Sequence, residues 1–327
     1  MKIVVLDDYQ DAFRTLSCFS RLVGYEVQVF HDTVKEPEAL AARLSDAEAA
    51  VLIQQRSPLP RAVVERLPGL KLVSQTGRNV SHIDLPACTE QGVVVSAGGA
   101  GSPNATAELA WGLILAALRH IPQEVERLKS GLWLGSLGTG VAGKTLGVYA
   151  YGRIGSLVAE VGRAFGMRVA CWGRAGSTAR ARAAGFAVAE SREAFFATAD
   201  VLSLHVPLSA ETHGLVTADD LSRMKPTALL VNTSRAQVIQ SGALVTALQD
   251  GRPGFAAVDV YEDEPVLGAN HPLIGMKNAL CTPHLGYVER DSYEALFGAA
   301  VDQILAFAAG RPINVANPEV LKARRPG

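Results

Sequence analysis

Three polar residues in the second half of this 327-residue chain each follow a short apolar run. Arg235 follows A-L-L-V-N-T-S, Glu264 follows A-A-V-D-V-Y-E-D, and His284 follows N-A-L-C-T-P. An arginine can hold a carboxylate through two parallel hydrogen bonds, and a histidine can carry a proton near neutral pH. A glutamate behind the histidine would orient the imidazole and favour its charged form. With a hydride carrier, these residue types predict a dehydrogenase of 2-hydroxy acids or a reductase of 2-keto acids.

Each of these residues also has an ordinary structural explanation. An arginine at a helix start is usually a surface charge, a glutamate before a proline usually lies in a solvated loop, and most histidines are structural. Their shared placement favours the catalytic interpretation, because ligands of an open parallel sheet bind beyond the carboxyl ends of its strands. If the three apolar runs are neighbouring strands, one edge of the sheet carries all three side chains.

A glycine-rich turn earlier in the chain predicts a site for the hydride carrier. Segment 143–166 reads G-K-T-L-G-V-Y-A-Y-G-R-I-G-S-L-V-A-E-V-G-R-A-F-G, in which a strand over Leu146–Ala150 precedes an apolar helical pattern. Gly152 lets the backbone approach a pyrophosphate, Gly155 lets the helix pack on the strand, and the helix N-terminus offers free N–H groups. A simple tight turn is the alternative. Ala150 replaces the first glycine of G-x-G-x-x-G, so we expect it to keep a negative φ.

The segment after the next strand bears on the choice of nicotinamide cofactor. Sites for NAD place an acidic residue about 20 positions beyond the glycines, where it holds the ribose 2′-hydroxyl. Here Gly173-Arg174-Ala-Gly-Ser177-Thr178 stands in that place, without a carboxylate. Arg174, with Ser177 or Thr178, could bind a 2′-phosphate. The sequence therefore predicts NAD(P) as cofactor, with a preference for NADPH and for reduction of the keto acid.

Short β-rich runs alternate with helical patterns along most of the chain, which predicts α/β architecture with parallel sheets. In the first part, strands are expected at Ile3–Leu6, Val27–Phe30, Ala50–Ile53, Leu70–Ser74 and Val93–Ser96, and helices at Glu36–Leu44 and Pro60–Leu67. Later strands are expected at Leu146–Ala150, Arg168–Trp172, Val201–His205, Ala228–Asn232, Ala256–Val260 and Ala279–Thr282. A linker is expected at Ser96–Asn104, and long helices at Ala105–Arg119 and Ser292–Ala309.

Composition and charge argue against several classes of protein. A hydrophobic content of 48% supports sizeable cores, and a formal net charge of -1 gives no electrostatic case for binding nucleic acid or an anionic membrane. The four cysteines lie far apart without C-x-x-C, which argues against disulfides and a metal site and suits a reducing cytoplasm. The N-terminal apolar run is too short for a signal peptide, and the longest apolar segment has about half of the ~20 residues that a membrane span requires. We therefore expect a cytoplasmic protein.

Five ordered motifs resemble those of the D-isomer-specific 2-hydroxyacid dehydrogenase family, and the resemblance covers nearly the full chain. The motifs are K-T-L-G-V-Y-A-Y-G-R-I-G (144–155), A-D-V-L-S-L-H-V-P-L (199–208), M-K-P-T-A-L-L-V-N-T-S-R-A (224–236), A-V-D-V-Y-E-D-E-P (257–265) and T-P-H-L-G (282–286). The resemblance implies two doubly wound domains: a Rossmann nucleotide-binding domain, residues 101–285, and a flavodoxin-like substrate domain, residues 1–100 plus 286–327. It also implies a homodimer. The domains are expected to close on substrate, with hinges near Gly98–Pro103 and Pro283–Gly286.

The resemblance also implies a role for each site residue. Arg235 would bind the substrate carboxylate and carbonyl, and His284 would be the acid/base paired with Glu264. Asp259 would lie near the nicotinamide carboxamide, and Thr106 would contact the cofactor. Residues 205–207 would line the adenosine pocket. The other expected cofactor contacts are Tyr151, Gly152, Arg153, Ile154, Gly155, Gly173, Arg174, Ser177, His205, Val206, Pro207, Thr212, Thr233, Ser234 and Gly286.

The substrate loop is where the chain departs from the family pattern. It reads T-G-R-N-V-S-H-I-D (76–84), with Arg78 and Asn79 where the family usually shows a glycine-rich G-x-G. In the family, backbone N–H groups of this loop receive the substrate carboxylate. Arg78 either adds a positive charge for a second acidic or polar group or points to solvent. The expected substrate-binding residues are Gly77, Arg78, Asn79 and Val80, with further lining from Gln54, Gln55, Arg56, Trp133 and Tyr287.

Three other proteins share this core. A phosphoglycerate dehydrogenase-like enzyme is one alternative, although many carry an additional C-terminal regulatory domain. A non-catalytic nicotinamide-sensing protein would not need Arg235, Glu264 and His284 together, because binding alone requires no proton carrier. A formate dehydrogenase usually has a longer N-terminal segment and pairs its catalytic histidine with glutamine. The sequence does not identify which 2-hydroxy acid is the substrate.

Overall fold

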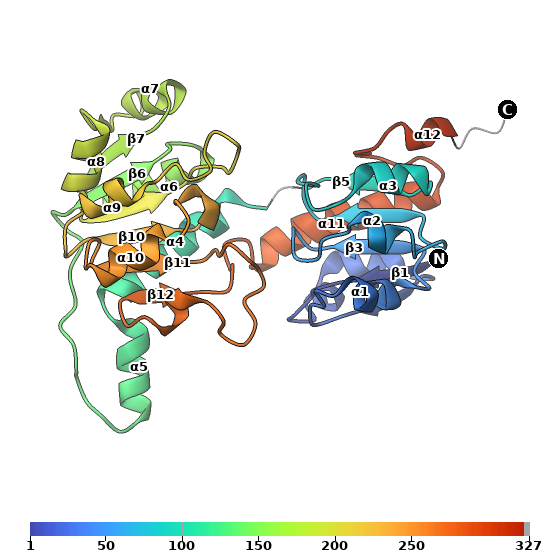
Figure 1. Cartoon of the computed structure of the whole chain (residues 1–327), viewed down its shortest axis with the longest axis horizontal. Coiled ribbons are helices and arrows are strands. Elements are labelled where there is room, and N and C mark those ends of the chain that lie inside the picture. Colours follow the sequence, from blue (N-terminus) through green and yellow to red (C-terminus); the bar gives the residue numbers. More distant parts are fainter. Residues whose placement is uncertain (100, 324–327) are drawn as a thin grey trace. The chain divides into compact units, whose positions relative to one another are not determined.

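The computed structural model describes residues 1–99 and 101–323, which form two compact units (Figure 1). Unit 1 comprises Met1–Ser102 and Val288–Gly327, and unit 2 comprises Pro103–Tyr287. The sequence analysis expected the boundaries between the two domains at 100/101 and 285/286. Ala100, within the expected linker and hinge, and residues 324–327 of the expected substrate domain lie outside the described residues.

Unit 1 is built on a five-stranded parallel sheet with the strand order β2-β1-β3-β4-β5. The strands are β1 Lys2–Val5, β2 Glu26–Val29, β3 Ala49–Leu52, β4 Leu72–Gln75 and β5 Val94–Ala97. The helices are η1 Phe13–Thr15, η2 Ser17–Leu22, α1 Pro37–Leu44, α2 Arg61–Val64, α3 Leu85–Glu90, α11 Arg290–Ala308 and α12 Val320–Ala323. Helices α1 to α3 bury Leu44, Val63 and Cys88 in one core with strand residues such as Val4 and Val73.

The long helix α11 belongs to unit 1 although nearly 200 residues separate it from β5. Glu289 caps its N-terminus by accepting hydrogen bonds from the N–H groups of Asp291 and Ser292. On its buried side, Gln303 is fully buried. With its amide oriented to satisfy its neighbours, it donates to Ser74 Oγ and Ser96 O at 2.7 and 3.1 Å. These bonds join α11 to β4 and β5.

Unit 2 is built on a seven-stranded parallel sheet with the order β12-β11-β10-β9-β6-β7-β8. The strands are β6 Thr145–Tyr149, β7 Arg168–Trp172, β8 Ala187–Val188, β9 Val201–Leu204, β10 Leu229–Asn232, β11 Phe255–Val258 and β12 Ala279–Cys281. The helices are α4 Pro103–Leu118, α5 Ile121–Lys129, α6 Arg153–Ala164, α7 Ala175–Ala183, α8 Arg192–Thr198, α9 Ala218–Ser222, η3 Ala236–Val238, α10 Ala243–Gln249 and η4 Pro272–Gly275.

The sheet of unit 2 is buried on both faces. Along β10, Leu229 and Val231 pack in the core that contains Trp111 of α4, whereas Leu230 packs in the opposite core with Leu248 of α10. Successive strand residues point to opposite faces, so a strand covered on both sides consists of apolar residues throughout. This explains why the sequence shows continuous apolar runs here rather than an alternating pattern.

The predicted fold class, two doubly wound parallel α/β sheets, is confirmed. The expected strands are present, with no end shifted by more than two residues. Strand β8 was missed because two residues carry no periodic signal. The helix expected over Pro60–Leu67 was wrong in extent, since α2 ends at Val64 and the chain turns before Leu67. No helix within residues 1–99 and 101–323 is long and apolar enough to cross a membrane, and the same residues hold no side-chain cluster suited to a metal ion.

One segment of unit 2 extends away from its sheet. We call residues 121–137, which comprise α5 and the loop after it, the arm (Figure 1). Helix α5 buries none of its residues. Trp133, expected to line the substrate pocket, is 76% exposed in the arm. The exposed apolar side chains of the arm are Ile121, Val125, Leu128, Leu132, Trp133, Leu134 and Leu137.

Candidate active site

Strands β10, β11 and β12 are neighbours in the sheet of unit 2, so the residues that follow them meet at one edge. Asn232 at the end of β10 pairs with Val258 of β11, which pairs with Cys281 of β12. Because the strands are parallel and in register, their carboxyl ends lie side by side. Each of the three candidate catalytic residues follows one of these ends.

Glu264 and His284 form a direct hydrogen bond. His284 Nδ1 lies 2.6 Å from Glu264 Oε2, and the two side chains are 17% and 18% exposed. The other carboxylate oxygen, Oε1, accepts a hydrogen bond from the backbone N–H of Tyr261 at 2.9 Å. A carboxylate at Nδ1 keeps the proton on that nitrogen, so Nε2 is the atom that can exchange a proton with a substrate. The ring edge of Tyr287 lies near the imidazole, with 5.7 Å between ring centroids.

The turn that carries His284 is held by Asp259, which is fully buried. Its Oδ1 accepts hydrogen bonds from Thr282 Oγ1 and from the N–H of Leu285, both at 2.7 Å, and its Oδ2 accepts one from the N–H of Gly286 at 2.9 Å. Burial raises the pKa of Asp259, and these donors oppose that rise. The Asp259 carboxylate therefore fixes the backbone of the two residues that follow His284.

His284 itself adopts a left-handed backbone conformation, with φ 54°. A side chain in this region costs about 1 kcal/mol and persists only where the surroundings enforce it. Thr106 contributes to that enforcement, since its hydroxyl donates to Gly286 O at 2.7 Å. Two predicted cofactor residues, Thr106 and Asp259, thus hold the histidine turn in place.

Arg235 follows β10 on a backbone fixed by Asn232. The amide of Asn232 donates to Arg235 O at 3.0 Å and accepts from the N–H and hydroxyl of Ser234 at 3.0 and 2.9 Å. The Arg235 guanidinium donates to Ser234 O at 2.7 Å. Thr233 is buried, and its hydroxyl has no hydrogen-bond partner within the described residues. A buried, unpaired hydroxyl beside Ser234 fits a site for a polar ligand such as a nicotinamide cofactor.

The glycine-rich turn joins β6 to α6 as expected, but the expectation for Ala150 was wrong. Its φ is 75°, in the left-handed region. The carbonyl of Ala150 accepts from the N–H of Gly152, and a Cβ on Gly155 would lie 2.3 Å from the same oxygen. Close packing of α6 on the turn therefore requires Gly155, and the strain at Ala150 is maintained by that packing.

The first turn of α6 fits a phosphate. Gly152 is the N-cap, no side chain among the described residues caps the helix, and a Cβ on Gly152 would meet no atom within 4 Å. Backbone N–H groups of Arg153, Ile154 and Gly155 at a helix N-terminus favour an anion in such open space. The residues present thus fit the pyrophosphate of a dinucleotide.

A cavity of about 710 Å³ lies beside this turn, between the ends of β6, β7 and β9. Predicted residues that line it are Gly173, Arg174, Ser177, Val206, Pro207 and Thr212, and lining residues that the sequence did not single out include Tyr149, Arg180 and Glu211. Its position at the strand ends, where the sheet order reverses between β6 and β9, is that of a nucleotide site in a doubly wound sheet.

Two hydroxyls that were expected to bind a 2′-phosphate form hydrogen bonds within the protein. Ser177 Oγ accepts from the N–H of Tyr151 at 2.7 Å, and Thr178 Oγ1 donates to Ala175 O at 3.0 Å within its own helix. Only Arg174 of the expected group presents an exposed charge to the cavity. Arg180 adds a second guanidinium, which donates to Tyr151 O at 3.1 Å.

His205 does not line this cavity, contrary to the expectation from the motif. Its Nε2 lies 3.0 Å from Ser203 Oγ, and burial lowers its pKa to about 4, so the ring is neutral near pH 7. Ser203 lies in β9 and His205 directly follows the strand, two positions later, so the two side chains point to the same side. That spacing in S-L-H was a readable signal of a structural pair.

In unit 1, the expected substrate loop follows β4. The side chain of Gln54 donates to Thr76 O at 2.8 Å, and its backbone N–H donates to Thr76 Oγ1 at 3.1 Å. Arg78 and Asn79 are exposed, and Asn79 Oδ1 accepts from the N–H of Ser81. Within the described residues, no hydrogen bond occupies the backbone N–H groups of Gly77, Arg78, Asn79 or Val80. Four successive donors of this kind suit a carboxylate.

Sequence reasoning singled out the candidate catalytic side chains but missed the residues that hold them in place. Asn232 and Thr282 are polar residues at the ends of buried apolar strands, and that placement is a signal in its own right. Tyr261 lies inside the motif A-V-D-V-Y-E-D-E-P, but no pattern in the sequence reveals that its N–H would bind Glu264.

Comparison with known proteins agrees with this geometry. Residues 111–286 match the family model described as D-isomer specific 2-hydroxyacid dehydrogenase, NAD binding domain. A glyoxylate reductase from Aeropyrum pernix is 36% identical over 93% of this chain and 93% of its own length. A D-3-phosphoglycerate dehydrogenase from Synechocystis sp. is 34% identical over 96% of this chain, which spans 60% of that protein. A solved oxidoreductase structure from Ralstonia solanacearum is 54% identical, with a TM-score of 0.94 and coverage of 98% of each chain.

Proposed function

The chain belongs to the D-isomer specific 2-hydroxyacid dehydrogenase family, and on that premise we propose that it works as a 2-keto acid reductase that prefers NADPH. It is a nicotinamide-dependent oxidoreductase that acts on a CH–OH group. The 2.6 Å contact between His284 Nδ1 and Glu264 Oε2 is the observation that supports the proposed chemistry most directly.

In the proposed reaction, the bound cofactor supplies a hydride to C2 of the keto acid. Arg235 binds the substrate carboxylate and polarises the keto oxygen. His284 donates the proton at Nε2 to that oxygen, which completes the hydroxyl group. Glu264 holds Nδ1 and orients the ring so that Nε2 faces the substrate oxygen. Asp259 keeps the His284 turn in position through the N–H groups of Leu285 and Gly286.

Turnover with glyoxylate and hydroxypyruvate tests this proposal, because relatives named glyoxylate reductase make these the first substrates to try. His284→Gln should lower kcat by about 10³-fold while NADPH still binds. Glu264→Gln should keep a measurable rate but move the high-pH fall in activity to lower pH. A wild-type protein that binds NADPH without any turnover of 2-keto acids would instead support the nicotinamide-sensing alternative.

The preference for NADPH is supported by the two guanidiniums of the 710 Å³ cavity, Arg174 and Arg180. Glu211 lines the same cavity and lies 3.9 Å from Arg174 in an exposed pair, which salt screens and which contributes little. Arg174→Ala should lower the kcat/KM for NADPH by roughly tenfold and leave that for NADH nearly unchanged. Equal losses with both cofactors would contradict the preference.

We also propose that the backbone N–H groups of Gly77 to Val80 bind the substrate carboxylate. The exposed guanidinium of Arg78 in this loop favours a substrate with a further acidic group, which keeps a phosphoglycerate dehydrogenase-like activity as the second candidate. Arg78→Ala should raise the KM for a phosphorylated or dicarboxylic substrate several-fold and leave the KM for glyoxylate unchanged. Equal effects on both would indicate that Arg78 faces solvent.

Further, the arm supports a homodimer formed through unit 2. Its apolar side chains, from 44% exposed at Val125 to 94% exposed at Leu137, form the kind of surface that an oligomer buries. Leu134→Asp together with Leu137→Asp should convert a dimer into a monomer in analytical ultracentrifugation.

The four free cysteines support a reducing cytoplasm as the location.

A further inference from the structure

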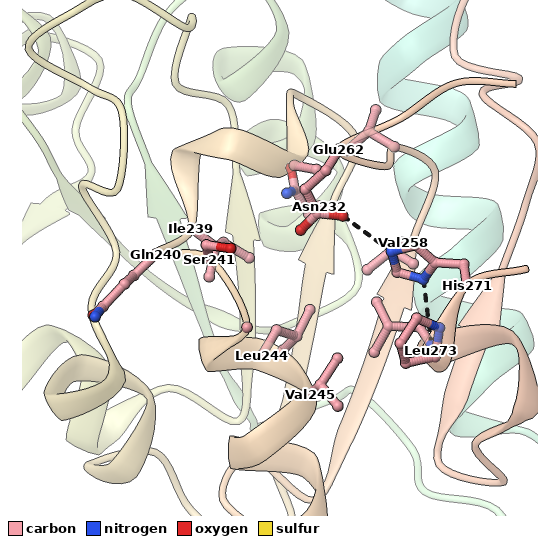
Figure 2. Close-up of a pocket in the computed structure, with 14 residues that line it drawn as sticks. Asn232, Ile239, Gln240, Ser241, Leu244, Val245, Val258, Glu262, His271 and Leu273 are labelled. Atoms are coloured by element: carbon pink, nitrogen blue, oxygen red, sulfur yellow. Dashed lines mark hydrogen bonds and ion pairs between the residues drawn. The ribbon is translucent and has the colours of Figure 1, made fainter. Parts of the chain in front are cut away.

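The loop between β11 and β12 carries Glu264. Part of this loop borders a cavity instead of packed side chains. A cavity of about 230 Å³ lies between this loop and helix α10 (Figure 2). The loop side is lined by Val260, Glu262 and Leu273, and the helix side by Leu244 and Val245. Where a loop borders a cavity, side-chain packing alone does not fix its position. Polar contacts along the loop must do so.

We propose that Tyr261 and His271 are positioning residues for the proton-transfer pair Glu264 and His284. They hold the loop that carries Glu264 against the strand end that carries His284. This inference rests on the proposed function, since it concerns the same pair.

Tyr261 links the two sides of the pair. Its backbone N–H donates to Glu264 Oε1 at 2.9 Å, and its hydroxyl donates to Thr282 O at 3.0 Å, two residues before His284. Burial raises the pKa of the Tyr261 hydroxyl, so the hydroxyl remains a donor throughout the working pH range. The residue thus fixes the carboxylate with its main chain and the strand end with its side chain.

His271 holds Tyr261 from the other end of the loop. The two rings meet edge to face with 5.0 Å between centroids. Figure 2 shows His271 between Glu262 and Leu273: Nε2 lies 3.0 Å from Glu262 Oε2, and Nδ1 accepts from the N–H of Leu273 at 3.3 Å. Because Nδ1 accepts a hydrogen bond, Nε2 carries the proton and donates it to Glu262. These contacts close the loop on itself and keep Tyr261 in place.

The two oxygens of Glu264 contact Tyr261 and His284 separately. Oε1 receives the N–H of Tyr261, and Oε2 receives Nδ1 of His284. A shift of the loop would lengthen the second contact and reduce the support for the protonated imidazole. Because catalysis falls steeply with small displacements of the reacting groups, such a shift should affect kcat more than substrate binding.

The main test compares variants that remove one link each. Tyr261→Phe keeps the ring and the main-chain N–H but removes the bond to Thr282 O. His271→Asn keeps an acceptor for the N–H of Leu273 but removes the ring contact and the bond to Glu262. Each should lower kcat for the keto acid about 5- to 20-fold and change the KM values for keto acid and NADPH by less than about twofold.

The pH profile gives a readout that a purely structural role would not move. Reduction needs a proton on His284, so activity is lost as pH rises, and a weaker contact with Glu264 should move that loss to lower pH. The charged or titratable groups near the ring include Glu264 and Tyr287, which contact it, and Asp259, which interacts with it through charge. The two variants alter none of them, so a shift reports the position of Glu264.

Matched variants separate positioning from folding. Glu262 is half exposed, so its replacement does not threaten the core. Glu262→Gln keeps an acceptor for His271 and should retain wild-type kcat, whereas Glu262→Ala should resemble His271→Asn. Val245→Ala enlarges the same cavity from α10 and should lower the melting temperature without moving the pH profile.

The outcomes are distinct. If Tyr261→Phe and Glu262→Ala keep the wild-type kcat and pH profile while His284→Gln loses turnover, the positioning role is wrong and the proposed function stands. If His284→Gln keeps turnover, the proposed function itself is wrong. If Val245→Ala reproduces the kinetic change, the effect belongs to packing around the cavity and the positioning role is again wrong.

Discussion

The two units have the same doubly wound architecture but present different chemical groups at the carboxyl edges of their sheets. In unit 2, the edge carries charged side chains that are each held by at least two partners, as Asp259 and Glu264 are. In unit 1, the loop after β4 offers backbone N–H groups from Gly77 to Val80. A proton transfer depends on the exact placement of one atom, whereas a carboxylate can be bound by several equivalent donors. Unit 2 should therefore be much less tolerant of small changes than unit 1.

The largest effect expected from this difference is at Asp259. Asp259→Asn replaces an acceptor oxygen with an amide nitrogen, so one of the N–H groups of Leu285 or Gly286 loses its acceptor. A buried unpaired donor costs about 1–3 kcal/mol, and the His284 turn is expected to move. We expect kcat to fall at least 100-fold. Steady-state kinetics with NADPH and a keto acid measures this, and a loss below tenfold would contradict the role of Asp259 in holding the turn.

A pair of glycine substitutions compares the two edges directly. Gly155→Ala in unit 2 would place a Cβ 2.3 Å from the backbone oxygen of Ala150, so α6 must move, at a cost of about 2–3 kcal/mol. Gly77→Ala in unit 1 meets only the flexible amide of Gln54, at 3.4 Å. Thermal unfolding should show a large loss for Gly155→Ala, together with weaker NADPH binding, and a minor one for Gly77→Ala. Equal losses would remove the distinction between the edges.

A smaller effect is expected from one buried histidine in each unit. Burial lowers the pKa of His82 in unit 1 and of His205 in unit 2 to about 4. The unfolded chain takes up these protons near pH 6.5, so stability is complete above that pH and is lost as pH falls towards 4. At pH 5 each residue should account for about 1–2 kcal/mol of the loss.

The matching measurement is the melting temperature between pH 7.5 and 5. Both His82→Phe and His205→Gln should make the fall in melting temperature between pH 7.5 and 5 smaller, when variants of equal stability at pH 7.5 are compared. The change should be larger for His82→Phe, because neither ring nitrogen of His82 has a hydrogen-bond partner within the described residues. A slope that neither substitution changes would show that carboxylates alone set the pH dependence.

The smallest effect concerns Ala150, whose left-handed backbone costs about 1 kcal/mol. Ala150→Gly removes that strain but increases the entropy of the unfolded chain, so the net gain should be below about 1 kcal/mol. The melting temperature should rise by about 1–3 °C. A decrease would indicate that the methyl group contributes packing that outweighs the strain.

The sequence predicted most of the fold, and it singled out the polar residues that the structure places after β10, β11 and β12, for reasons visible in particular residues. Continuous apolar runs such as A-L-L-V mark strands buried on both faces, and the polar residues after them mark the carboxyl edge of the sheet, where ligands of such sheets bind. A short pair such as Ala187–Val188 carries no period, so β8 was missed. The expectation for the backbone of Ala150 was wrong because close packing against Gly155, five residues later, determines its conformation.

The supporting contacts of the site were not predictable in the same way. Ser177 was expected to bind phosphate, yet its hydroxyl accepts from the N–H of Tyr151. Which of several nearby polar groups a serine binds depends on the closure of the turn, which sequence spacing does not encode. The same holds for the N–H of Tyr261 on Glu264.

The position of α11 has a consequence for synthesis on the ribosome. The helix that covers one face of the first sheet, and buries Gln303 against Ser74, is made about 200 residues after β5. At roughly 5–20 residues per second, the N-terminal strands wait about 10–40 s for their missing helix, while the intervening segment is already complete enough to fold. During synthesis, the N-terminal sheet is thus the part of the nascent chain that most needs protection from aggregation.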